Sequence, residues 1–398
     1  MGRGSMRLQV LILASAQAIF QTASVMVMTV GGLAGGHIAT RPELATLPIA
    51  AMFLGTAAVT FPASMWMTRV GRRAGFVAGA LLGVMGGIAG AAGIWIGSLL
   101  LLSFGTFLVG AYQAFAQFYR FAAGEVANDA FRSRAISLVL AGGVVAALAG
   151  PLVGRFGADL FAAQYAGSFL LMALGSLAGA GILCALRVPT QKEEAGASAV
   201  GRPWSAIVSQ PAYLVALFGA ATGYGIMILA MTATPLAMVH HHHDLPAAAM
   251  VIQLHVLGMF LPSFFTGSLI ARFGVLRIML TGVLILTGHV LMTLTGTGFG
   301  SFAGALVLLG VGWNFLYIGG TTLLTTTYTA MERGRAQATN DMTIFAVSLA
   351  CSFSAAALLQ AFGWQAMNLL LLPWLGLTAA SLLWLGYTRR RQPVSVSA

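Results

Sequence analysis

The stretches TRVGRRAGF (residues 68–76) and ARFGVLRIM (residues 271–279) lie about 200 residues apart, and each follows a long apolar segment. In both stretches an arginine and one apolar residue precede a glycine, and a further arginine follows. A second pair, GEVANDAFRSRA (124–135) and MERGRAQATND (331–341), repeats a mixture of acidic and basic residues at a similar interval. Repetition at a fixed interval indicates that the chain consists of two related halves.

The composition is typical of a membrane protein. Of 398 residues, 59% are hydrophobic and only 7% are charged, and the mean hydropathy is +0.90. Apolar runs of about 20 residues, long enough for a helix to cross the hydrocarbon core of a bilayer, recur along the chain. The sequence predicts an all-α membrane protein with twelve transmembrane helices in two six-helix halves, near residues 8–33, 44–66, 74–95, 97–118, 135–154, 164–186, 211–239, 247–270, 277–296, 300–328, 342–362 and 367–388.

The longest polar stretch inside the chain is RVPTQKEEAGASAVGRP, residues 187–203. Its content of charge, glycine and proline is typical of a linker, and it divides the predicted spans six and six. We therefore predict an N-terminal half over residues 1–187, a cytoplasmic linker over residues 188–210 and a C-terminal half over residues 211–398.

The basic residues predict the orientation in the membrane. With the N-terminus inside, 18 of the 20 lysines and arginines fall on the cytoplasmic side, and only Arg41 and Arg155 fall outside. We expect a multi-pass protein of the bacterial inner membrane with both termini in the cytoplasm. The net charge of +11 follows from this bias and from contact with anionic lipid, so no nucleic-acid partner is expected.

Several classes of function lose support. The single lysine, Lys192, lies in the predicted linker, so the sequence has no Gly-x-x-x-x-Gly-Lys loop to hold ATP. All nine acidic residues fall in loops or at the ends of predicted helices, which disfavours a carboxylate proton relay at mid-membrane depth. No arrangement typical of an active site is evident, so we expect a protein that is not an enzyme and that has no prosthetic group.

Four soft side chains recur at helical spacing. Met227 and Met231 lie four residues apart in the seventh predicted span, as His255 and Met259 do in the eighth, at matching distances from the loop that joins the spans. Thioether sulfur together with imidazole nitrogen favours Cu(I), so this set predicts a copper site near the middle of the bilayer. An alternative stays open, in which the methionines pack the core and His255 is bonded to a backbone carbonyl.

A run of four histidines lies in the loop between these two spans, and it consists of His240, His241, His242 and His243. A solvated polar loop is the simplest interpretation. The functional alternative is a metal-capture site at the mouth of the transport path. Asp244, which follows the run, is also suited to cap the next helix.

The first repeat described above resembles the loop after the second helix of the major facilitator superfamily, which usually reads Gly-x-Leu-Ala-Asp-Arg-x-Gly-Arg-Lys. The resemblance implies that superfamily's fold for essentially the whole chain. It also implies a part in conformational gating for the matching residues of both repeats, which are Arg69, Gly71, Arg72, Arg73, Arg272 and Gly274.

The sequence departs from the superfamily pattern at one position of each repeat. Thr68 and Ala271 stand where the superfamily has an aspartate, which predicts that the acid and base latch between helix ends is weakened or rebuilt. The stretch GPLVG (150–154) resembles a motif of antiporters in the superfamily, although a simple glycine and proline bend explains it equally well.

The methionine and histidine pairs resemble those of the CcoA-type copper importers, a bacterial branch of the superfamily. The resemblance implies import of Cu(I) by alternating access for cytochrome oxidase assembly, with copper as substrate and a cytoplasmic copper chaperone or exporter as partner. It assigns the handling of copper to Met227, Met231, His255 and Met259. Two alternatives stay open, namely a proton-linked antiporter of small organic molecules or drugs and a transport-inactive metal-binding sensor or assembly factor.

Overall fold

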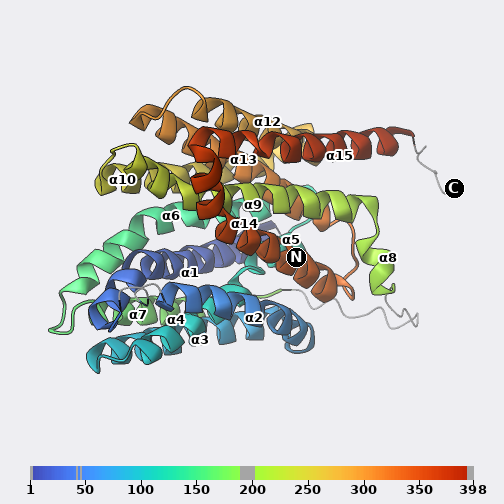
Figure 1. The fold of residues 1–398 in the computed structure, drawn as a ribbon. Coiled ribbons are helices and arrows are strands. Elements are labelled where there is room, and N and C mark those ends of the chain that lie inside the picture. The colour runs from blue at the N-terminus through green and yellow to red at the C-terminus, as the bar shows by residue number, and fades with distance from the viewer. Residues whose placement is uncertain (1–2, 42–43, 45–46, 189–201, 392–398) are drawn as a thin grey trace. The chain divides into compact units, whose positions relative to one another are not determined.

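The computed structural model describes residues 3–41, 44, 47–188 and 202–391. Within these ranges the chain forms α-helices and no β-strand, which confirms the predicted all-α class (Figure 1). The helices are α1 (Arg3–Ile38), α2 (Leu47–Val70), α3 (Arg72–Trp95), α4 (Leu99–Ala116), α5 (Tyr119–Val126), α6 (Arg132–Ala158), α7 (Ala166–Cys184), α8 (Trp204–Val208), α9 (Pro211–His240), α10 (Leu245–Phe260), α11 (Ser263–Phe273), α12 (Val275–Thr293), α13 (Phe299–Leu324), α14 (Arg333–Leu369) and α15 (Leu371–Arg391).

Eleven helical segments within the described ranges are long and apolar enough to cross a membrane. One of them joins α4 to α5 and another joins α10 to α11. The second break falls at Pro262, whose ring removes a backbone N–H from the helical ladder. The protein is therefore a multi-pass membrane protein.

The predicted eleventh span (342–362) is the part of α14 that precedes a sharp bend. Gly363 lies there with φ 75° and ψ 170°, a backbone conformation that side-chain-bearing residues rarely adopt. The bend falls between the predicted eleventh and twelfth spans, and α15 then supplies most of the twelfth. However, α14 begins at Arg333, nine residues earlier than the predicted span, and this places charged residues inside the helix.

The chain divides into two compact units. The first contains Met1–Ala199 together with Arg333–Met342, and the second contains Val200–Glu332 together with Thr343–Ala398. Most of the predicted linker, residues 189–201, lies outside the described residues, and Trp204–Val208 within it forms the short helix α8. The predicted boundaries at residues 187 and 211 stay a prediction.

In the first unit, α3 packs against α4 and α7, α1 packs against α6, and α2 packs against α4 (Figure 1). The contact between α2 and α4 is made by backbone. A Cβ atom on Gly110 would collide with the carbonyl oxygen of Met52, and one on Gly55 would collide with the carbonyl oxygen of Phe107. Small residues thus let these two helices approach closely, as is common in membrane proteins.

In the second unit, α13 is the central helix. Helices α9, α10 and α12 all pack against it, and α15 packs against α9 and α12 (Figure 1). Gly310 of α13 meets α10 so closely that a Cβ atom there would lie 2.6 Å from the carbonyl oxygen of His255. This contact brings the predicted histidine of α10 against α13.

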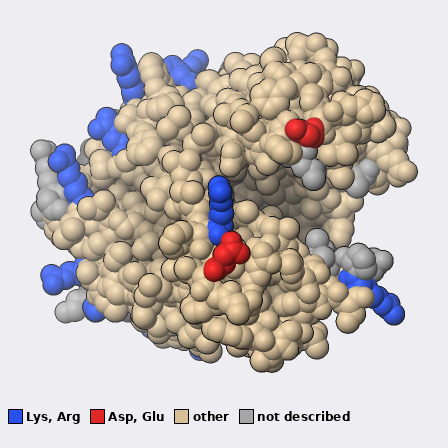
Figure 2. Space-filling view, turned by 90° about the vertical axis from the view of Figure 1, so that its left-hand side faces the viewer, with Lys and Arg blue, Asp and Glu red and all other residues tan. Residues whose placement is uncertain are grey.

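The surface of the spans is apolar. Large hydrophobic side chains such as Leu100 and Phe353 are 77% and 79% exposed. Figure 2 looks onto the left-hand side of Figure 1, where helix ends face the viewer, and even there charged side chains are few and scattered. Large apolar side chains this exposed along the spans are compatible with lipid and are costly to expose to water.

A polar cluster holds the segment before α14 in the second unit. The guanidinium of Arg202 donates to both carboxylate oxygens of Glu332, at 2.8 and 2.7 Å, and to the carbonyl oxygen of Thr327. The backbone N–H of Thr329 also donates to Glu332. Chiefly because of the hydrogen bonds from Arg202, the pKa of Glu332 falls from 4.5 to about 2.

This cluster predicts a pH-dependent contribution to stability. A carboxylate whose pKa is lower in the folded state stabilises the protein above its ordinary pKa, and this stabilisation is lost as the pH falls towards the folded-state value. We expect Glu332→Gln to lower the melting temperature most near pH 6, and the difference from wild type to shrink below about pH 4.5. Thermal unfolding in detergent between pH 6 and pH 3 tests this, with the exposed Asp129→Asn as control. A difference that does not change with pH would contradict it.

Candidate functional site

The predicted methionines of α9 lie on a helix whose main neighbour is α13. Met227 is buried and Met231 is half-buried. Gly223, one turn before Met227, faces Leu316 and the carbonyl oxygen of Trp313, so this side of α9 lies against α13. Helix α9 packs mainly against α13 and only lightly against α10. The two predicted pairs therefore border the same central helix.

His255 is fully buried and has one nitrogen bound and one free. Its Nδ1 lies 2.8 Å from the carbonyl oxygen of Leu306 on α13. Because a carbonyl only accepts, Nδ1 carries the proton, and Nε2 presents a lone pair. Nε2 has no hydrogen-bond partner among the described residues. The backbone bond anticipated as an alternative thus exists, and it leaves the other nitrogen available to a ligand.

His289 of α12 provides a useful contrast. It is equally buried, but both of its nitrogens have contacts, because Nδ1 lies 2.8 Å from the carbonyl oxygen of Ala305 and Nε2 lies 3.0 Å from Asn368 Oδ1. His255, rather than His289, is therefore the histidine suited to a ligand.

A polar knot lies beside Met259, and it was not foreseen from the sequence. Asn314 of α13 donates to the carbonyl oxygen of Met259 at 2.7 Å and to the hydroxyl of Ser263 at 2.6 Å. The hydroxyl of Thr266 donates to Asn314 Oδ1. The first of these bonds satisfies a backbone carbonyl beside the break at Pro262, and the other two tie Asn314 to side chains of α11, so the knot joins α10 and α11 to α13.

Aromatic side chains in the second unit form a wall that the sequence analysis also missed. Trp313 and Tyr317 of α13 are stacked, with ring centroids 4.9 Å apart and planes at 20°. Tyr224 of α9 lies edge-on to both, at 5.6 and 5.2 Å. Phe260 of α10 approaches Trp313 at 5.8 Å, and Phe345 of α14 approaches Tyr224 at 6.2 Å. Four helices thus contribute to one aromatic cluster, which we call the aromatic wall.

Trp313 adds an unmatched donor to the aromatic wall. The side chain is 2% exposed, and its Nε1 has no hydrogen-bond partner in the part of the chain that the structure describes. An indole N–H can only donate, and leaving it unpaired in an apolar interior is costly. The wall thus contains a free buried donor, and the adjoining helix α10 carries a free buried acceptor, His255 Nε2.

The histidine run lies at the end of α9 and in the turn that follows. His240 is the last residue of α9, and His242 has a left-handed backbone with φ 63°. His243 Nε2 lies 2.8 Å from the carbonyl oxygen of Thr297. Partial burial, followed by the neighbouring histidines, lowers the pKa of His241. Asp244 caps α10, because its side chain accepts from the N–H of Ala247 at 2.9 Å.

Nothing in the described ranges groups three or more His, Cys, Asp or Glu side chains as ligands for a metal ion. That finding covers neither methionine sulfur nor a mixed set with a single histidine. The metal role of Met227, Met231, His255 and Met259 stays a prediction, as does capture by the histidine run.

The two loop repeats adopt the same backbone conformation. Gly71 before α3 has φ 87° and ψ 160°, and Gly274 before α12 has φ 88° and ψ 149°. Both values favour glycine over any other residue. Of the neighbouring arginines, Arg69 and Arg73 are exposed, and the guanidinium of Arg272 lies over the ring of Phe273 at 5.2 Å.

Glu125 supplies the carboxylate that the first repeat lacks. Arg72 is buried and forms an ion pair with Glu125 at 2.7 Å, and Arg333 approaches the same carboxylate at 3.2 Å. Gln337 accepts a further hydrogen bond from Arg72. The predicted rebuilding of the latch is consistent with this geometry, whereas the gating role itself stays a prediction.

A second ion pair corrects an expectation from the sequence. Arg120 and Asp341 lie 2.6 Å apart, and each side chain is only 2% exposed. The prediction that every acidic residue lies in a loop or at a helix end is wrong for Asp341, which lies in the third turn of α14 because that helix begins at Arg333. A buried carboxylate is therefore present in the first unit.

Comparison with known proteins identifies the family. The model of the Major Facilitator Superfamily matches residues 11–260 and 220–398. The riboflavin transporter RfnT of Brucella anthropi is 40% identical over 379 residues, which cover 95% of each chain. The uncharacterized transporter YdeG of Bacillus subtilis is 30% identical over 80% of this chain and 77% of its own.

Solved structures agree in fold. The E. coli fucose:proton symporter FucP has a TM-score of 0.75 at 14% identity, covering 96% of this chain and 99% of its own. A bacterial homologue of the iron transporter ferroportin has a TM-score of 0.71 at 13% identity, covering 95% of this chain and 99% of its own. Taken together with the helical architecture, these matches show that the chain belongs to the Major Facilitator Superfamily of membrane transporters.

Proposed function

We propose that this transporter moves a planar heteroaromatic solute of the flavin class, with riboflavin as the first candidate, across the bacterial inner membrane by alternating access. The observation that carries the proposal is the aromatic wall of the second unit, built from Tyr224, Phe260, Trp313, Tyr317 and Phe345. The similarity to a riboflavin transporter along almost the whole chain supports it. Both termini lie in the cytoplasm in this proposal, as the basic residues predict.

The chemistry of the wall suits such a ligand. Flat rings gain about 1 to 3 kcal/mol for each aromatic side chain on which they stack. The edge of a flavin carries both carbonyl acceptors and an N–H donor. Trp313 Nε1 donates and His255 Nε2 accepts, and both atoms are buried without partners among the described residues. Sites that leave polar atoms unpaired until the ligand arrives favour the ligand that pairs them.

Copper import is the second candidate, and His255 is the observation in its favour. Histidines that bind metals commonly donate their other ring nitrogen to a backbone carbonyl, which fixes the tautomer. The contact between His255 Nδ1 and Leu306 has this form, and Met259 lies one turn further along α10. In this alternative Cu(I) is the substrate, and Met227 and Met231 complete the set of copper ligands. The imported copper would serve cytochrome oxidase assembly through a cytoplasmic chaperone or exporter.

Uptake by purified protein in liposomes tests the two candidates against each other. We expect time-dependent accumulation of radiolabelled riboflavin that excess unlabelled riboflavin abolishes and Cu(I) does not. Protein-free liposomes and liposomes with a boiled sample provide the background. Accumulation of copper without riboflavin would overturn the flavin proposal. Binding of either solute without accumulation would favour a transport-inactive sensor.

His255→Met separates the candidates within a single site. Methionine keeps a soft sulfur for Cu(I) but accepts hydrogen bonds poorly. If the ligand is a flavin, we expect the half-saturating riboflavin concentration to rise roughly tenfold, as the loss of one buried hydrogen bond implies. His289→Met, made at an equally buried histidine, is the control for folding at matched membrane abundance. Unchanged riboflavin uptake would remove His255 from flavin recognition.

A further inference from the structure

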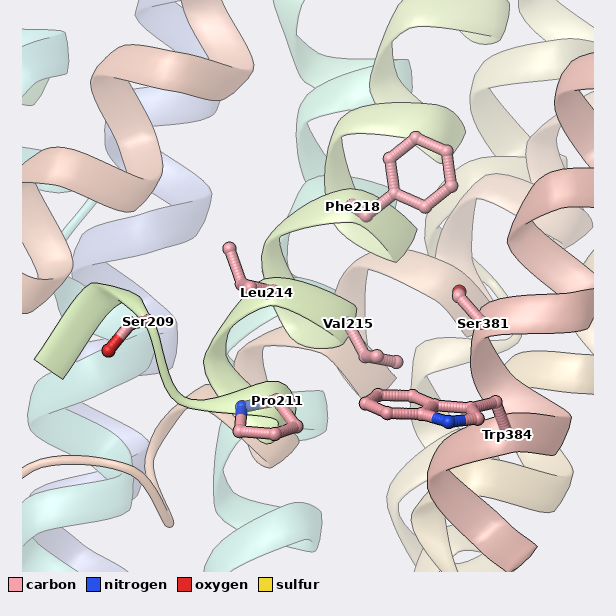
Figure 3. A pocket seen from close by; sticks show the side chains of 7 residues that line it. All are labelled: Ser209, Pro211, Leu214, Val215, Phe218, Ser381 and Trp384. Carbon is pink, nitrogen blue, oxygen red and sulfur yellow. The ribbon is translucent and has the colours of Figure 1, made fainter. Parts of the chain in front are cut away.

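An apolar groove lies where α9 begins and α15 ends, away from the aromatic wall along α9. Its volume is about 400 Å³. Helix α9 contributes Pro211, Leu214, Val215 and Phe218, the turn before it contributes Ser209, and α15 contributes Ser381 and Trp384 (Figure 3). Figure 3 shows Val215 and the Trp384 ring on facing sides of the groove. Two hydroxyl groups and the indole nitrogen are the polar side-chain groups of this lining.

The groove opens at the surface of the membrane-spanning helices. Leu214 and Trp384 are 50% and 52% exposed, although each lies on an apolar span. Antiparallel helices α9 and α15 pack together, so the first turns of one lie beside the last turns of the other. Tryptophan near the end of a span is typical of the boundary between hydrocarbon and headgroups. The groove therefore lies at the edge of one leaflet, which the basic residues predict to be the cytoplasmic leaflet.

Positive charge follows directly at the headgroup level. Helix α15 ends with Arg389, Arg390 and Arg391, five to seven residues after Trp384, which is about 7 to 10 Å along the helix axis. Arg389 and Arg390 are exposed. Long arginine side chains near helix ends reach towards the interface. Their charge complements that of a phosphate group just outside the hydrocarbon.

We propose that this groove binds one acyl chain of an anionic phospholipid of the cytoplasmic leaflet, with the lipid phosphate held by Arg389 and Arg390. The apolar lining from Leu214 to Phe218 contacts the hydrocarbon. The hydroxyl of Ser209 lies at the level of the glycerol esters, Trp384 marks the boundary with the hydrocarbon, and Ser381, one turn before Trp384 on α15, lies on the hydrocarbon side of that boundary. The site is thus a lipid site on the second unit, and it does not depend on the identity of the transported solute.

Quenching of tryptophan by brominated lipids tests the proposal directly. The full-length protein is placed in phosphatidylcholine bilayers that contain increasing fractions of dibrominated phosphatidylglycerol or of dibrominated phosphatidylcholine. The fluorescence of Trp384 is obtained by subtracting the emission of the Trp384→Phe variant from that of the wild type. We expect this fluorescence to be quenched at a much lower fraction of the anionic lipid than of the zwitterionic lipid. Trp95, the last residue of α3, is 54% exposed and serves as the control. Its fluorescence, obtained in the same way with Trp95→Phe, should show no preference for the anionic lipid.

Charge variants identify the headgroup contact. The double variant Arg389→Gln with Arg390→Gln should bind the anionic lipid less tightly. The fraction of anionic lipid that quenches half of the Trp384 fluorescence should rise roughly fivefold for each arginine removed. The control, Arg134→Gln combined with Arg277→Gln, removes the same charge from other exposed positions and should change nothing. Equal quenching by both lipids, or an identical response of the two double variants, would overturn the proposal. Loss of the preference on adding glycerol 3-phosphate would overturn it as well, because the arginines would then bind a soluble phosphate.

Discussion

Asp341→Asn is expected to destabilise the first unit by about 3 to 5 kcal/mol, because it removes one partner of a buried ion pair and leaves the other charged. Arg120 and Asp341 are each 2% exposed and lie 2.6 Å apart. Arg120 also donates to the carbonyl oxygen of Gln117 at 2.6 Å and lies over the ring of Phe121 at 4.4 Å. These contacts hold the guanidinium in place, so it cannot escape to solvent when the carboxylate is neutralised.

Thermal unfolding of the purified protein in detergent measures this cost. Arg132→Gln is the matched control, since its ion pair with Asp129 is exposed and should contribute less than about 1 kcal/mol. The double variant Arg120→Gln with Asp341→Asn should regain part of the lost stability, because no unpaired charge then remains buried. A single variant no less stable than Arg132→Gln would show that the pair is solvated in the protein.

Much of the fold follows from the lengths of the apolar segments and from the glycines at which the chain bends. The apolar runs predict the helices closely, because a bilayer requires every spanning segment to satisfy its own backbone hydrogen bonds. The join between the last two spans was placed after residue 362, and the chain bends at Gly363. Gly71 and Gly274 adopt matching left-handed conformations, as expected of equivalent positions in two related halves.

The buried charge of Asp341 could not be read from hydropathy. A window that favours apolar residues begins the span at residue 342 and leaves the polar turns before it outside. In the structure α14 starts at Arg333, where Glu125 pairs with Arg333 and Arg120 pairs with Asp341. Ion pairs with residues of other helices thus help to decide where α14 begins. The hydropathy of one segment cannot predict such pairs, because the partners lie far away in the sequence.

The candidate site shows a similar division. Spacing singled out His255 through its pairing with Met259, and the structure supports this choice because His255 Nε2 has no hydrogen-bond partner among the described residues, whereas both ring nitrogens of His289 have one. The sequence does contain a pattern that indicates the aromatic wall. Trp313 and Tyr317 are four residues apart on α13, and residues at this spacing share one helix face. They went unnoticed because aromatic residues also fill ordinary spans. Their significance appears only when Tyr224, Phe260 and Phe345 join them from other helices.

Tyr224→Leu is expected to raise the half-saturating concentration of riboflavin about tenfold while the maximal rate of uptake changes little. Tyr224 is half-buried and lies edge-on to Trp313, Tyr317 and Phe345, so its ring can also meet a ligand on the wall. Loss of one stacking ring costs about 1 to 3 kcal/mol, and a tenfold change corresponds to about 1.4 kcal/mol. Leucine keeps an apolar side chain at this half-buried position of a transmembrane helix, so insertion and folding should persist.

The control for this prediction is Tyr224→Phe, which keeps the ring and removes only the hydroxyl. Initial rates of riboflavin uptake in liposomes, measured against concentration at equal protein content, should place Tyr224→Phe close to wild type and Tyr224→Leu far from it. Equal losses in both variants would assign recognition to the hydroxyl instead of the ring. Wild-type uptake in Tyr224→Leu would show that the aromatic wall serves only packing, because a ligand that stacks on Tyr224 must bind less tightly once that ring is gone.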